Sequence, residues 1–72
     1  MNQINEMSHT EVLRVRLEVL RVEHRDLDDA IHALQESRRG DQFTIRRLKA
    51  KKLRLKDQII KIEDELTPDI IA

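Results

Sequence analysis

Aliphatic residues recur along this chain at intervals that alternate between three and four residues. One run extends from Leu13 to Leu34 and a second from Ile45 to Leu66. Residues with this spacing line one side of an α-helix, so each run predicts a helix with an apolar stripe. The stripes are Leu13, Leu17, Leu20, His24, Leu27, Ile31 and Leu34, and then Ile45, Leu48, Lys52, Leu55, Ile59, Ile62 and Leu66.

The start of the first helix is marked by a capping signal. Ser8 is followed three residues later by Glu11. A serine hydroxyl can accept from a free N–H of the first turn, while the glutamate reaches back to the N–H of the cap. We therefore predict a first helix over about residues 8–38, preceded by a disordered tail at 1–7.

A short polar segment separates the two stripes. Gly40 can take the left-handed conformation that ends a helix, and Asp41 can cap the next one. The turn is therefore predicted at 38–41 and the second helix at about 42–66, ending before Pro68 because the residue preceding a proline disfavours helical dihedrals. The C-terminal tail, residues 67–72, is expected to be frayed or to dock through its two isoleucines.

A connection this short makes the two helices antiparallel neighbours. Centring the turn between residues 39 and 40 pairs positions whose numbers sum to 79, and the two stripes then meet in seven layers. The predicted fold is all-α: one antiparallel, coiled-coil-like two-helix hairpin over residues 8–66. Its core consists of the stripe residues named above, except Lys52.

A second set of apolar residues is not needed to close this hairpin. We expect it to be exposed beside the first stripe, and exposed contiguous apolar area commonly marks an interface. Two or more hairpins would bury it in a four-helix bundle or larger coiled coil, and a foreign helix in the same place is the alternative. The predicted interface is Val12, Val15, Val19, Val22, Leu53 and Ile60.

Composition supports an association of this kind. The chain has 72 residues, no cysteine and a single aromatic residue, so its core must be aliphatic and no disulfide can stabilise it. No window approaches the roughly 18 apolar residues of a membrane span. We expect a cytoplasmic protein that forms dimers or larger homo-oligomers.

Charge is distributed in blocks. Residues 1–37 carry a net −4, residues 38–56 a net +8 and residues 57–72 a net −4. One interpretation is pairing across the hairpin, with Arg14 opposite Glu65, Arg16 opposite Glu63, and the acids of 23–29 alongside the bases of 51–56. The other is an anionic partner such as RNA or DNA. The candidate anion-binding residues are Arg46, Arg47, Lys49, Lys51, Arg54 and Lys56.

Polar residues interrupt the stripes at mid-hairpin. His24 could pair with Asp28 and fix the helix register in a pH-sensitive way, or it could simply be a hydrogen-bonded core histidine. The Lys52 ammonium could reach Asp28 or water. A coiled-coil seam has no cavity for a substrate, so we expect no catalytic residues. The pair His32 and Glu36 is too small for a zinc site, and we expect no metal or cofactor.

Two strings in the middle of the chain carry a family resemblance. The stretch from His24 to Leu34, with its H-x-x-L-D-x-x-I pattern, and the L-K-x-x-K-L-x-L-K-D pattern that begins at Leu48 resemble the YdcH-like family of small bacterial proteins. The resemblance covers roughly residues 20–62. It implies a short helical protein and no activity, because that family is itself of unknown function.

These observations favour a non-enzymatic coiled-coil interaction module that self-associates or docks on a partner helix through its apolar rows. The alternative is a nucleic-acid-associated accessory protein that uses the basic face of the second helix.

Overall fold

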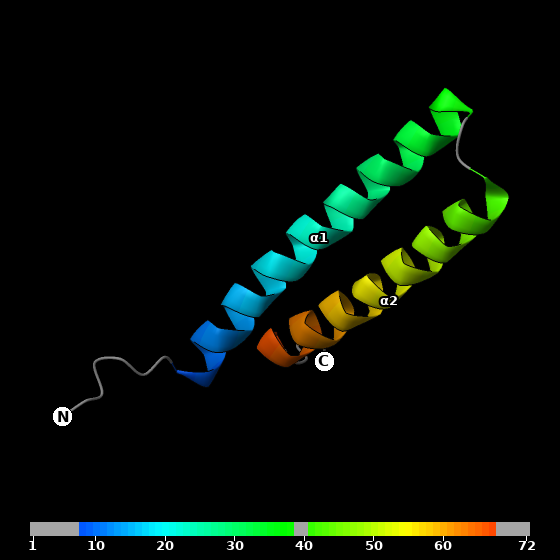
Figure 1. The fold of residues 1–72 in the computed structure, drawn as a ribbon. Coiled ribbons are helices and arrows are strands. Elements are labelled where there is room, and N and C mark those ends of the chain that lie inside the picture. Colours follow the sequence, from blue (N-terminus) through cyan, green and yellow to red (C-terminus); the bar gives the residue numbers. More distant parts are fainter. Residues whose placement is uncertain (1–7, 39–40, 68–72) are drawn as a thin grey trace.

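The computed structural model describes residues 8–38 and 41–67, which form two antiparallel helices joined at one end (Figure 1). Helix α1 is His9–Ser37 and helix α2 is Gln42–Leu66. The predicted helical hairpin is confirmed, and the described residues contain no strand. Neither helix has a stretch long and apolar enough to cross a membrane.

Helix α1 begins with the predicted capping box. The Glu11 N–H donates to Ser8 Oγ at 3.1 Å, and the Ser8 N–H donates to Glu11 Oε1 at 3.1 Å. Both bonds satisfy backbone groups that the first turn leaves without an intrahelical partner. The residues before Ser8, for which a disordered tail is predicted, lie outside the described residues.

The reversal between the helices starts earlier than the glycine predicts. Arg38 is the C-cap of α1 and takes a left-handed conformation with φ 60°. Only residues 38–41 separate the helices, so the chain must change direction as soon as α1 ends. Gly40, to which we assigned the left-handed conformation, lies outside the described residues.

Asp41 caps α2 as predicted. Its carboxylate accepts from the Thr44 N–H at 2.6 Å, and the Thr44 hydroxyl donates to the second carboxylate oxygen at 3.3 Å. The backbone hydrogen bond from Thr44 is the main reason why the pKa of Asp41 is lower than usual.

Helix α2 ends at Leu66. The Thr67 N–H and hydroxyl both donate to the Glu63 carbonyl, at 2.9 and 2.8 Å. Pro68 and the two isoleucines of the predicted tail lie outside the described residues, so the docking of that tail stays a prediction.

The core lies along the seam between the helices and has two parts. At the open end, Leu17 and Leu20 of α1 pack with Ile59 and Ile62 of α2. Each of these four is at most 8% exposed. Leu13, Leu55 and Leu66 pack against them, as pairing to a sum of 79 requires.

Near the turn, Ile31 and Ile45 are also buried. The remaining core positions, His24, Leu27, Leu34 and Leu48, are half-buried. No core position in the middle of the seam is fully buried, and Lys52 and Asp28 lie there with intermediate exposure.

Candidate functional site

The middle of the seam is closed by an ion pair between the helices. Lys52 Nζ donates to Asp28 Oδ1 at 2.6 Å, and both side chains are about one-third exposed, at 34% and 37%. This hydrogen bond is the largest cause of a lowered pKa at Asp28, and the positive charge of Lys52 adds to it. Of the two destinations considered for the Lys52 ammonium, the structure shows Asp28.

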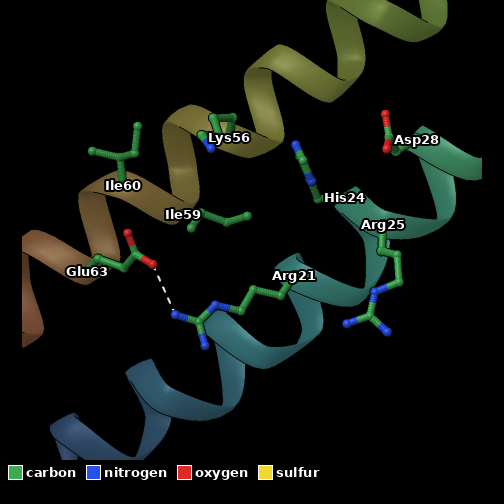
Figure 2. Close-up of a pocket in the computed structure, with 8 residues that line it drawn as sticks. All are labelled: Arg21, His24, Arg25, Asp28, Lys56, Ile59, Ile60 and Glu63. Atoms are coloured by element: carbon green, nitrogen blue, oxygen red, sulfur yellow. Dashed lines mark hydrogen bonds and ion pairs between the residues drawn. The ribbon is translucent and has the colours of Figure 1, made fainter.

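His24 does not pair with Asp28 among the described contacts. The histidine that approaches Asp28 is His32, whose Nδ1 lies 3.0 Å from the Asp28 carbonyl oxygen and 3.9 Å from its carboxylate. His24 instead projects from α1 toward α2 beside Lys56 (Figure 2). The pairing of His24 with Asp28 is therefore not observed, because Lys52 and His32 take the positions around that carboxylate.

A shallow groove of about 670 Å³ follows one side of the seam (Figure 2). Arg21 crosses it and donates to Glu63 at 3.0 Å. We call this side of the hairpin the groove flank. Its lining is Arg21, His24, Arg25, Asp28, Lys56, Ile59, Ile60 and Glu63.

The opposite flank carries a different set of side chains. His9 approaches Glu65 at 3.3 Å there, and a smaller hollow of about 240 Å³ is lined by residues that include Arg16 and Glu65. The predicted pairs Arg14–Glu65 and Arg16–Glu63 are wrong. Arg14 follows a core leucine and Glu65 precedes one, so the two lie on opposite flanks of the seam.

The sequence pattern contains a signal for this arrangement. On each helix, two charged residues of the groove flank directly follow core residues and are seven residues apart. They are Arg21 and Asp28 on α1, and Lys56 and Glu63 on α2. Residues in that heptad position on two antiparallel helices flank the seam on the same side. Pairing residues by number alone missed this, because it ignores the flank on which each side chain lies.

The basic run of α2 is largely uncompensated. All six candidate anion-binding residues are exposed, and none forms an ion pair within residues 8–38 and 41–67. They do not share one face. Their heptad positions place Arg46, Lys49 and Lys56 toward the groove flank, and Arg47, Lys51 and Arg54 toward the opposite flank.

The valine row lies on the outside of α1. Its four side chains are 43–54% exposed. At 100° per residue, Val15 and Val22 are nearly opposite the core stripe, and Val12 and Val19 are more than 90° from it. Our expectation that the row lies beside the first stripe is therefore wrong, because it faces away from α2.

The other two residues of the predicted interface lie elsewhere. Leu53 is 64% exposed and Ile60 43%. Leu53 lines a groove-flank hollow with His24 and Lys56, and Ile60 lines the larger groove. In Figure 2, Ile60 points away from α1. The six apolar residues thus form two separate surfaces on each hairpin rather than one.

These surfaces offer apolar area and positive charge. Among the described residues, no group of three or more His, Cys, Asp or Glu side chains is arranged to hold a metal ion. The exposed aliphatic groups can be buried against a partner, and the exposed cations can attract anions.

Comparison with known protein families places this chain beside an uncharacterised family. A family model described as a protein of unknown function (DUF465) matches residues 17–63, which include both halves of the hairpin and all of the groove residues. No curated protein and no solved structure matches the chain significantly. This match does not confirm the YdcH-like name, which stays a resemblance.

Proposed function

This chain belongs to the DUF465 family of proteins of unknown function, and we propose that it is a non-enzymatic coiled-coil interaction module. The observation that carries this proposal is the valine row. Four β-branched apolar side chains lie together on the outer side of α1, where the hairpin's own core does not use them. An exposed apolar row of this kind is typical of a surface that packs against another helix.

A second copy of the hairpin is the partner we propose. A chain of this size buries a small fraction of its surface, and its seam is only half-buried at mid-length. Association adds buried aliphatic area without disulfides or metal. A helix of another protein, bound on the same valines, is the other form of the proposal.

Replacing two of the valines tests the proposal. Val15→Gln combined with Val19→Gln removes apolar area, replaces two β-branched residues by a better helix former and introduces no charge. Association should weaken at least about tenfold, since burying the exposed part of each valine is worth about 1 kcal/mol. Sedimentation equilibrium gives the mass, and circular dichroism at the same concentrations gives the helix content.

Glu36→Gln provides the matched control. It lies on the outward side of α1 beyond the valines and is exposed. It should leave the association constant within about twofold of the original chain. Equal association of the double variant and the original chain would refute a role for the valine row.

A second candidate function rests on the unpaired cations of α2. Arg47, Lys51 and Arg54 form a row on the opposite flank and have no ion pair within the described residues. Such a row could follow the phosphates of a nucleic acid. With one aromatic residue in the whole chain, stacking on bases would contribute little, so the binding would be independent of sequence.

Salt dependence tests this candidate. Three phosphate contacts on single-stranded RNA give a slope of about −2 in log K against log salt, or about a 15-fold loss between 50 and 200 mM. Fluorescence anisotropy with a labelled oligonucleotide measures it. Replacing the three cations of the row by Gln should abolish the slope, whereas Arg14→Gln should not. Binding that is insensitive to all three replacements would contradict a phosphate role.

A further inference from the structure

The groove flank of α2 carries a second helical stripe of its own. Lys49, Leu53, Lys56 and Ile60 are spaced four, three and four residues apart, so they line one side of the helix. All four are exposed, and the stripe borders the two groove-flank hollows. We call it the lysine stripe. Its aliphatic residues alternate with lysines whose stems also offer apolar surface.

The outer side of α1 is complementary to this stripe in length. The valine row spans ten residue steps and the lysine stripe eleven, or about 15 Å and about 16 Å of helix. Both repeat with the same alternation of three and four residues. Two helices that present such rows can pack side by side along the full length of both.

The two surfaces are also complementary in charge. The carboxylates around the valine row are Glu11, Glu18, Glu23 and Asp26, all exposed, with Arg16 and Arg25 as the cations beside them. The lysine stripe carries Lys49 and Lys56, with Arg46 one heptad before Leu53 and the carboxylates of Asp57 and Asp64 on its outer side. The formal charges sum to −2 on the first surface and +1 on the second. None of these charged groups forms an ion pair within the described residues.

Resting on the proposed function, we propose that self-association is heterologous: the valine row of one copy packs against the lysine stripe of another. Acidic residues of the first copy then lie beside lysines of the second, while aliphatic side chains meet between them. The alternative, in which two valine rows face each other, would bring together two surfaces of the same net charge.

The position of the two surfaces sets the form of the assembly. The valine row faces away from α2, and the lysine stripe lies on the groove flank, so each copy has both surfaces free at once. A heterologous contact therefore continues from copy to copy and yields a closed ring or an open chain. A contact between two valine rows would stop at the dimer.

Mixing two defective chains tests this arrangement. The first chain carries Val15→Gln and Val19→Gln, and the second carries Leu53→Gln and Ile60→Gln. Glutamine adds no charge, so the two altered surfaces gain no new attraction for each other. The first chain keeps its lysine stripe and the second keeps its valine row. We expect each chain alone to associate at least about tenfold more weakly than the original.

An equimolar mixture should regain association and stop at a one-to-one heterodimer, because only one intact pair of surfaces remains. Sedimentation velocity with a fluorescent label on one chain measures this, and circular dichroism reports the helix content of each chain and of the mixture. A second chain that still dimerises alone, or a mixture no heavier than its components, would overturn the heterologous contact. If the original chain is itself a monomer, the proposed self-association fails as well. If the original chain associates but the mixture does not regain association, only the heterologous contact fails.

Discussion

At the scale of the residue, the bond between Lys52 and Asp28 is the best-defined contact across the middle of the hairpin. Lys52 is a charged residue at a core position, and its ammonium leaves the seam toward the groove flank to reach Asp28 at 2.6 Å. The sequence indicates this partner, because the spacing from Leu27 places Asp28 beside the seam. It does not indicate that His32 rather than His24 approaches the same carboxylate, since both lie four residues from Asp28.

The lowered pKa of Asp28 predicts how stability depends on pH. The stabilisation from this pair is fully present above the ordinary aspartate pKa of 3.8 and is lost as the pH falls through the lower folded value. Asp28→Asn should therefore lower the free energy of unfolding at pH 7 and make a smaller difference at pH 2. Urea unfolding followed by circular dichroism measures both values. Asp57→Asn is the control, because Asp57 is exposed and has no ion pair within the described residues. An equal effect of Asp28→Asn at both pH values would contradict a role for the charge.

At the scale of the element, both helix starts follow from local chemistry, and the end of α1 does not. Ser8 and Asp41 cap their helices through contacts within three residues, which a sequence reveals directly. The left-handed residue at the end of α1 is Arg38, although glycine is the residue that adopts this conformation most readily. Residue type alone therefore does not identify this position, although only four residues separate the two helices and the chain must reverse within them.

Removing the first cap should destabilise the hairpin measurably. Ser8→Ala eliminates the bond to the Glu11 N–H and should lower the free energy of unfolding by about 1 kcal/mol. Thr10 is the second residue of α1. Thr10→Ala should be neutral or slightly stabilising because alanine is the better helix former. Chemical unfolding of both variants at one protein concentration makes the comparison. A cost for Thr10→Ala equal to that of Ser8→Ala would show that the cap is not the cause.

At the scale of the whole molecule, the heptad pattern predicts the hairpin and its register. The positions of the exposed valines and charged residues need a further step. The stripes predict which residues meet, because apolar burial is specified by the helical repeat alone. Placing the valines correctly requires their angle around α1, and placing the charges requires the flank of each residue. Both quantities follow from 100° per residue once the core stripe is known, and pairing residues by number alone leaves them out.

The proposed self-association depends on the valine row being an interface between copies. The most direct measurement is sedimentation equilibrium of the original chain from low micromolar to high micromolar concentration, in 50 and 500 mM salt, with helix content followed in parallel. We predict a mass that rises with concentration from 8.6 kDa to beyond that of a dimer, with helix content rising alongside it. Burial of the apolar rows should preserve part of the association in high salt. A fully helical monomer at every concentration and both salts would contradict the account.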